Sequence, residues 1–520
     1  MEQSRLISVG ETTLTENIFQ KNDDHILMSS FKYVLVLVTF WIFIFTVGFL
    51  VGLKKELNVL IFLIFSLSLP LCHIEHWNNK TTTSFPFYDL YKYFAERKVT
   101  GSEGLSDGQL RLLTAFLYEE YIVITHTAQN PQGVGKVAYC HYYDCNRNEL
   151  PGTRFESFVF PMTAVHCPRR SGVKYVSLSF ENSDPPKEEP IPLLNRIFEC
   201  KINLKKFFSN TVSHLDPPHE IGVCVGQIYG EEKKWLEIIE YVEHHKLMGA
   251  TMFYFTILEM DEYSKRTIED YQRLGEIEAT FVNTEYEKIN WLFHMIQVHV
   301  SDALLFIISR VVFIQECFFR SKFHSKWVIG IDIDERLVMT QMPLMSYLRQ
   351  QSPDTCEINF GSRRIQKLYD DPEKYISTNQ TRSSLSFYKY NQTTTHRWGA
   401  FKSIFKPAKV HVIHFHWTVQ QHEGCRIKTA KRQEGYIRHY RTTDSSSLAG
   451  SWVSIFKPYT TTQMDPEFSK QLEERVIKRV EYLYKLHPVF CETIDQKIRK
   501  HFPHDLHCVN STLVNTFDNK

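Results

Sequence analysis

The sequence lacks several motifs that define common enzyme classes. It contains no Gly-x-Gly-x-x-Gly, P-loop, His-Glu-x-x-His or Gly-x-Ser-x-Gly pattern, which argues against dehydrogenases, P-loop ATPases, zincins and serine hydrolases. No Cys-x-x-Cys pair occurs among the 11 cysteines, so a structural zinc site is disfavoured. The chain also lacks net charge: 60 basic against 59 acidic residues leaves +1, so we expect no nucleic-acid partner.

The composition supports a folded protein of several domains. Of the 520 residues, 43% are hydrophobic and 14% aromatic, which provides enough apolar material for a core and excludes wholesale disorder. This length predicts roughly two to four domains. The cysteines are too dilute for a small disulfide-built scaffold, and their odd number leaves at least one unpaired or linked to another chain.

Two long apolar runs near the N-terminus predict a membrane anchor. Tyr33–Leu53 contains no charged residue, and a helix of that length spans about 30 Å, the hydrocarbon thickness of a bilayer. A second apolar run, Leu57–Cys72, follows a short stretch that includes Lys54 and Lys55. Either the first run is a single type II anchor or both runs span as a hairpin. The positive-inside rule places Lys54 and Lys55 in the cytosol, and a hairpin would then put both the N-terminus and residues 73–520 outside it. A single anchor with a cytosolic N-terminus also puts residues 73–520 outside the cytosol.

Sequons and cysteines favour the same side of the membrane. Asn-x-Ser/Thr triplets, which are glycosylation acceptors, occur at Asn79, Asn379, Asn391 and Asn510. Cys72 lies at the predicted membrane edge, and the ten cysteines beyond it could form five disulfides in an oxidising compartment. The pairs that are close enough in sequence for local loops are Cys140 with Cys145 and Cys491 with Cys508.

Changes in pattern divide the rest of the chain. Strand-like runs separated by turn residues predict a β-rich module, and the proline-rich stretch Ser183–Pro192 predicts a linker. From Ile221 onward, apolar runs alternate with helical patterns, which indicates a parallel sheet covered by helices. The predicted segments are a tail (1–32), an anchor (33–72), a stem (73–104), the β-rich module (105–213), an α/β domain (214–500) and a C-terminal tail (501–520).

Two carboxylates follow one buried run of the α/β domain. The run Trp327–Ile333 ends in acid, with Asp332 near its end and Asp334 directly after it, and alternation along a strand points both side chains to one face. In open α/β sheets, ligands bind beyond the carboxyl ends of strands. Such a pair can share Mg²⁺ or Mn²⁺, which would neutralise a nucleotide diphosphate. The structural alternative is an acidic strand end that faces solvent.

Histidines and arginines further along are additional candidates. Val-His-Val-Ile-His-Phe-His-Trp contains His414 and His416 on one strand face, and an imidazole ligand beside two carboxylates would favour Mn²⁺. Ordinary packing is the alternative for each histidine. Arg438 and Arg441 could contact phosphates, as could the basic run 426–432, although a solvated basic face explains that run as well.

Several sequence blocks together resemble glycosyltransferase family 92. The blocks, in the order found in that family, are Cys224–Ile257, Ile268–Glu278, Gln315–Leu337 with its Asp-x-Asp-Glu signature, Phe401–Trp417 and Tyr436–Arg441. The resemblance covers roughly residues 220–490, and the β-rich stretch before it resembles what precedes this domain in family members. It implies a GT-A-like nucleotide-sugar-binding domain in a type II Golgi membrane enzyme.

The resemblance also implies an activity and roles for residues. The implied reaction is inverting transfer of galactose from UDP-galactose to a sugar of a glycoprotein glycan. Asp332 and Asp334 would hold manganese and the diphosphate, with His414, or else His416, as the C-terminal histidine. Inversion needs a carboxylate base near the acceptor hydroxyl, for which the candidates are Glu335, Glu423 and Glu434.

Two features depart from the family pattern. The family usually has one apolar anchor run, whereas this chain has two. Residues 298–310 interrupt the block before Cys317, and a retained intron is one hypothesis that transcript sequencing tests. The rival functions are a degenerate, membrane-anchored glycan-binding protein and a metal-dependent phosphoester hydrolase that uses the same acids and histidines.

Overall fold

The computed structural model describes only part of the chain. Apart from Val38 and Trp41, the described residues are 110–128, 135–160, 163–182, 186–196, 217–230, 232–282, 315–394, 401–413, 416–442 and 459–487. The chain divides into two compact units, 1–73 and 74–520, and every described strand lies in the second. No helix within the described ranges is long and apolar enough to cross a bilayer. Apart from Val38 and Trp41, both predicted anchor runs lie outside those ranges, as do the stem, segment 298–310, and the pair Cys491 and Cys508.

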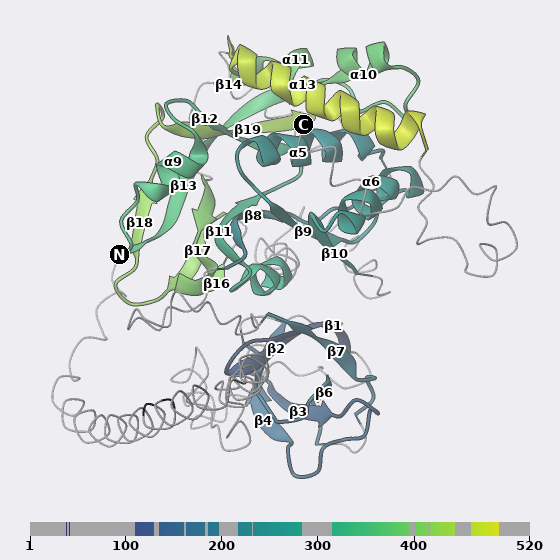
Figure 1. Ribbon diagram of the computed structural model, residues 1–520, viewed down its shortest axis with the longest axis vertical. Coiled ribbons are helices and arrows are strands. Elements are labelled where there is room, and N and C mark those ends of the chain that lie inside the picture. The colour runs from purple at the N-terminus through teal and green to yellow at the C-terminus, as the bar shows by residue number, and fades with distance from the viewer. Residues whose placement is uncertain are drawn as a thin grey trace, which may run out of the picture. The chain divides into compact units, whose positions relative to one another are not determined.

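A seven-stranded sheet occupies the predicted β-rich region. Its strands are β1 (Leu110–Leu117), β2 (Tyr121–Ala128), β3 (Val137–Tyr143), β4 (Phe155–Phe158), β5 (Ala164–Pro168), β6 (Tyr175–Ser179) and β7 (Ile191–Asn195), in the order β4-β3-β6-β7-β1-β2-β5. A bridge between Val159 and Val165 joins the two ends of this order. The sheet therefore curls into a barrel (Figure 1) around a core of buried aliphatic and aromatic side chains.

The barrel corrects two expectations from the sequence. Cys140 forms a disulfide with Cys167, between β3 and β5, so the local pairing of Cys140 with Cys145 is wrong, and Cys145 is an exposed free thiol. The stretch expected to be a linker ends in strand β7, which pairs with β1 and β6. Pro192 has no backbone N–H to donate, and it lies near the start of the strand, outside the residues 193–195 that pair with β1.

A second, eleven-stranded sheet forms the rest of the described structure. Its strands are β8 (His219–Val225), β9 (Met252–Ile257), β10 (Ile277–Phe281), β11 (Ser325–Ile331), β12 (Glu335–Met339), β13 (Thr355–Lys367), β14 (Gln392–Thr394), β15 (Phe401–Phe405), β18 (Arg426–Thr429), β19 (Gly435–Thr442) and β20 (Tyr459–Thr461). A separate hairpin joins β16 (Val410–Ile413) to β17 (Thr418–Gln421). The predicted mixed α/β class is therefore confirmed.

The first strands of this sheet are parallel, as predicted. They lie in the order β10-β9-β8-β11, and helices α5 (Trp235–Leu247) and α6 (Glu262–Arg273) connect β8 to β9 and β9 to β10. Trp235, Ile238 and Val242 of α5 are completely buried, which matches the apolar face in the sequence. The chain order reverses between β8 and β11, and that switch point is where open α/β sheets bind ligands.

The remaining helices extend the fold. They are α9 (Leu344–Arg349), α10 (Thr378–Ser384), α11 (Ser386–Lys389), α13 (Pro466–Val480), the 3₁₀ turn η4 (Pro407–Lys409) and the π-helical turn η5 (Glu481–Lys485). The α13 helix begins as expected, because the Asp465 carboxylate accepts a hydrogen bond from the Phe468 amide and Pro466 follows the cap. Helix α13 packs against α5 (Figure 1) through Leu472, Val476 and Val480.

Buried contacts connect the barrel to the second sheet through the helical stretch 315–321. Phe318 and Phe319 belong to one apolar cluster with Phe116 of the barrel. Glu316 in the same stretch is fully buried and accepts hydrogen bonds from Thr114 at 2.8 Å and Thr125 at 2.6 Å. A buried carboxylate is stable only when it is paired, so these donors fix the barrel to this stretch.

Candidate active site

The two predicted aspartates lie at the switch point of the sheet. Asp332 follows β11 directly, and Gly226 follows the neighbouring strand β8. Any Cβ at position 226 would overlap the Asp332 carboxylate, so glycine permits the close approach of the two chain segments. The Asp332 side chain remains 42% exposed, which leaves it accessible to a ligand at the carboxyl end of the strands.

Lys402 of β15 neutralises part of this acidic site. Its ammonium lies 2.7 Å from Asp332 Oδ2 and 3.1 Å from Glu335 Oε2, and its side chain is only 2% exposed. Burial lowers the pKa of Lys402, but the two carboxylates outweigh burial and raise it above its ordinary value. For Asp332, burial raises the pKa, and Lys402 outweighs that effect so that the net shift is downward. The ion pair therefore stays charged at neutral pH.

His439 of β19 contacts the second aspartate. Its Nε2 lies 3.1 Å from Asp334 Oδ2, and its Nδ1 lies 3.5 Å from Glu335 Oε1. The antiparallel register of β12 and β19 sets Glu335 opposite His439, and the backbone amide of Tyr440 donates to Asp334 O at 2.8 Å. The imidazole is thus held beside Asp334 by the sheet itself.

Glu335 lies beneath the aspartates and holds them in place. It is 1% exposed, and its Oε2 accepts a hydrogen bond from the Asp332 amide at 2.9 Å. Burial raises its pKa, and Lys402 offsets that rise only in part. With Lys402 and His439 on either side, both carboxylate oxygens face protein groups. Glu335 is therefore a positioning residue for the Asp332–Asp334 turn.

Arg336 fixes the same turn from its other side. Its guanidinium donates to the carbonyl oxygens of Ile333 at 2.5 Å, Glu335 at 2.9 Å and Glu237 of α5 at 3.2 Å. Charged donors make strong hydrogen bonds to buried carbonyl groups. The aspartate turn is therefore anchored to the first turn of helix α5 as well as to strands β15 and β19.

The predicted histidines and arginines differ in their surroundings. His414 lies outside the described residues, and His416 Nδ1 lies 3.0 Å from the Phe401 carbonyl oxygen. Arg438 is fully buried and donates to Tyr440, Thr462 and the Tyr390 carbonyl. Its guanidinium therefore makes hydrogen bonds within the core. Arg441 lies opposite Gln366 in the pairing of β19 with β13.

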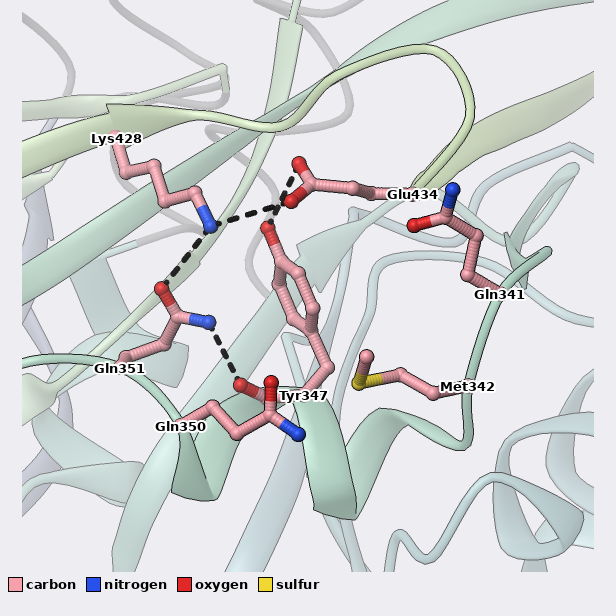
Figure 2. A pocket seen from close by; sticks show the side chains of 7 residues that line it. All are labelled: Gln341, Met342, Tyr347, Gln350, Gln351, Lys428 and Glu434. Carbon is pink, nitrogen blue, oxygen red and sulfur yellow. Dashed lines mark hydrogen bonds and ion pairs between the residues drawn. The ribbon is translucent and has the colours of Figure 1, made fainter.

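Two of the candidate bases are remote from this cluster. Glu423 is exposed in the turn that precedes β18. Glu434 precedes β19 and lies five residues from His439, about 17 Å along an extended strand. It lines a separate pocket together with Tyr347 and Lys428 (Figure 2). Of the three glutamates, only Glu335 belongs to the aspartate cluster.

The sequence interpretation missed Lys402, His439 and Gly226 as site residues. His439 lies between Arg438 and Arg441, which were chosen as candidates for their charge. Alternation along β19 sets His439 on the face opposite Arg438, and this was the signal that could have identified it. Lys402 lies within an apolar block of the sequence. A lysine at an inward position of a buried strand indicates a nearby carboxylate, because burying an unpaired ammonium is costly. Gly226 follows an apolar strand directly, a common position for ligand approach.

The donor atoms suit a divalent cation completed by a substrate. Asp334 and His439 together offer the oxygen and nitrogen ligands that Mn²⁺ accepts. Across the part of the chain that the structure describes, no three His, Cys, Asp or Glu side chains converge as a complete metal site. Ions that act on phosphates commonly take one or two protein ligands, with phosphate oxygens and water filling the remaining positions.

A comparison with known protein families identifies the family of this chain. The family model described as glycosyltransferase family 92 matches residues 219–480, which is 262 of the 520 residues. The chain belongs to this family. The matched range begins at the first residue of β8 and ends at the last residue of α13. No curated protein matches the sequence significantly.

Family membership makes the protein a transferase of sugar residues and implies a nucleotide-sugar donor and a glycan acceptor. The switch-point cluster lies inside the matched range, since Asp332, Asp334, Lys402 and His439 all fall between residues 219 and 480. The barrel strands precede that range. The family-92 segment therefore contains every residue of the cluster.

Proposed function

We propose that this protein is a metal-dependent transferase that moves a hexose, with galactose the first candidate, from a UDP-sugar to a sugar of a glycoprotein glycan. The observation that carries the proposal is the cluster at the switch point, where Asp332 and Asp334 are held by Lys402 and His439. A GT-A-like arrangement is part of the proposal, supported by the parallel order β10-β9-β8-β11 and by the acidic turn after β11.

The charge of the cluster supports the need for a cation. Asp332, Asp334 and Glu335 provide three carboxylates, against the ammonium of Lys402 and the guanidinium of Arg336 on the other side of the turn. A nucleotide diphosphate is itself an anion and would be repelled by such a site. We propose that Asp334 and His439 hold Mn²⁺ or a similar ion. When bound, that ion would neutralise the diphosphate and assist its departure as a Lewis acid.

Inversion at the transferred sugar is also proposed, on the family relationship. Direct displacement requires a base that removes the acceptor hydroxyl proton. Glu335 is held in a positioning role by the Asp332 amide and Lys402. The base is therefore to be sought among carboxylates that face the acceptor, by testing each with both a transfer and a donor-hydrolysis assay.

We also propose that the protein is a Golgi membrane protein with its catalytic part in the lumen. Three disulfides join described residues: Cys140–Cys167, Cys224–Cys317 and Cys356–Cys425. Such bonds persist in oxidising compartments of the secretory pathway. The apolar run Tyr33–Leu53 supports a single type II anchor, with a two-span hairpin as the alternative.

The decisive experiment uses the full-length protein in detergent with a panel of UDP-sugars and glycan acceptors. Donor hydrolysis and transfer are measured with Mn²⁺, with Mg²⁺ and with a chelator. We expect transfer with one UDP-sugar that requires the ion and that disappears in Asp334→Ala. Asp354→Ala, which changes an exposed aspartate in a turn, serves as the matched control and should retain activity.

Other results would assign a different function. A folded protein that binds glycans but no nucleotide would be a glycan-binding relative without catalysis. Release of phosphate from phosphoesters without sugar transfer would indicate a hydrolase. Transfer that persists in the presence of the chelator would contradict the proposed metal dependence while leaving the transferase assignment in place.

A further inference from the structure

A small polar pocket lies at the far end of the ladder formed by β12 and β19. It has a volume of about 150 Å³ and lies beside helix α9. Its lining residues are Gln341, Met342, Tyr347, Gln350, Gln351, Lys428 and Glu434 (Figure 2). Glu335 and His439 pair at the opposite end of the same ladder, so the pocket is separate from the aspartate cluster.

One wall of the pocket is a preformed hydrogen-bond network. Lys428 Nζ lies 3.2 Å from Gln351 Oε1 and 3.5 Å from Glu434 Oε1, and the Tyr347 hydroxyl donates to Glu434 Oε2 at 3.3 Å. The Gln351 amide in turn donates to the Tyr347 carbonyl at 2.7 Å. Figure 2 shows these side chains, which come from α9 and the residues just after it, from β18 and from the turn before β19, joined by hydrogen bonds and an ion pair. The wall is therefore ordered before any ligand arrives.

Two further amides complete the lining. Gln341 and Gln350 are exposed, and their side chains form no hydrogen bond with any residue in the described ranges. Each amide offers both a donor and an acceptor. Met342 adds a partly buried apolar surface. The pocket thus presents mixed donors and acceptors around a small apolar patch.

The charge of the lining selects the class of ligand. The ammonium of Lys428 faces the Glu434 carboxylate, so the two formal charges cancel and the other lining side chains are neutral. An anion such as a phosphate would meet the carboxylate, and an apolar ligand would strip water from four amide and hydroxyl groups. A neutral compound with hydroxyl groups that both donate and accept hydrogen bonds satisfies the lining, and the hydroxyl-rich ring of a sugar has that chemistry.

We propose that this pocket binds one neutral sugar residue of the acceptor glycan, at a distance from the sugar that receives the transferred residue. This inference rests on the proposed transferase function. The separation of about 17 Å between Glu434 and His439 along β19 is one that a short, branched glycan can span. The pocket would therefore select glycans by length and by a neutral residue remote from the transfer point.

The test compares two variants of the full-length protein with the wild type. Gln341→Ala with Gln350→Ala removes the two amides, and Gln420→Ala is the matched control because it removes an exposed glutamine elsewhere, on β17. Binding of a desialylated N-glycan, and of its sialylated form, is measured directly by calorimetry. Transfer is then measured with the same long glycan and with a disaccharide acceptor.

We expect the double variant to bind the neutral glycan about tenfold more weakly, as the loss of two hydrogen bonds predicts. Its KM for the long acceptor should rise similarly, with unchanged kcat for the disaccharide. Equal binding by all three proteins, or tighter binding of the sialylated glycan, would overturn the proposal. Glycan binding that depends on the two glutamines in a protein without transferase activity would refute the proposed function and leave the pocket assignment standing.

Discussion

Lys402 and His439 are single residues that each contact two carboxylates of the same turn. Lys402 pairs with Asp332 and Glu335, and His439 pairs with Asp334 and Glu335. Glu335 is thus shared between a cation and an imidazole, which fixes the spacing of the two aspartates. At the scale of single residues, the proposed metal binding depends on which side chain lies beside Asp334.

The histidine that supports catalysis is expected to be His439. His439→Ala should lower sugar transfer about 100-fold or more and weaken Mn²⁺ binding, because it removes the nitrogen ligand beside Asp334. His416→Ala should have a much smaller effect, since His416 contacts the Phe401 carbonyl. Steady-state transfer and metal titration check both. A larger loss in His416→Ala than in His439→Ala would contradict this assignment.

Glu240 of α5 is expected to make a contribution to stability that depends on pH. Burial raises its pKa to about 7 against the counteracting charge of Arg336, and Ser386 donates to its carboxylate. The folded protein therefore keeps this proton at pH values where the unfolded chain releases it. Stability is lost as the pH rises from about 4.5 to about 7, by up to about 3 kcal/mol.

Glu240→Gln tests this contribution, because the amide retains the hydrogen bonds without titrating. Urea unfolding at pH 5 and at pH 7.5 should show a smaller loss of unfolding free energy in the variant than in the wild type. If both proteins lose the same free energy between these pH values, Glu240 does not titrate as described.

At the scale of elements, the disulfide between Cys224 and Cys317 ties β8 to the helical stretch that precedes β11. It closes a loop of 93 residues, and both sulfurs belong to buried residues. Replacing both cysteines with alanine should lower the unfolding free energy by about 2–5 kcal/mol. Chemical denaturation checks this value. Cys145→Ala is the control and should change stability little, because Cys145 is free and exposed.

At the scale of the whole molecule, the barrel and the second sheet share buried contacts. Phe318 and Phe319 cluster with Phe116 of the barrel, and Glu316 takes two of its donors from barrel strands. A barrel joined in this way is a structural part of the folded unit. Separation would expose aromatic surface and remove the two threonine donors of the Glu316 carboxylate, which would keep its ion pair with Arg320.

A fragment that begins at residue 214 is therefore expected to aggregate or unfold at a lower temperature than one that begins at residue 105. Soluble yield, gel filtration and thermal melting of the two fragments measure the difference. A monomeric 214–520 fragment with the same melting temperature as the longer one would show that the barrel contributes nothing to stability.

The sequence by itself determined the elements whose patterns are local. The runs Thr251–Leu258 and Ile277–Val282 predict strands β9 and β10 because a buried parallel strand needs continuous apolar residues. Asp465 and Pro466 predict the start of α13 because capping involves only neighbouring residues. Asp332 and Asp334 could be placed at a strand end because they come where a continuous apolar run ends. The family blocks added the relationship that the matched range confirms.

Only the tertiary structure decided which distant residues meet. His439 reaches Asp334 through the register of β12 with β19, and Lys402 reaches Asp332 through the pairing of β11 with β15. Cys140 finds Cys167 rather than its near neighbour Cys145 because the barrel brings β3 and β5 together. These pairings join segments up to about a hundred residues apart, and hydrogen bonds between strands leave no local periodicity that a single sequence displays.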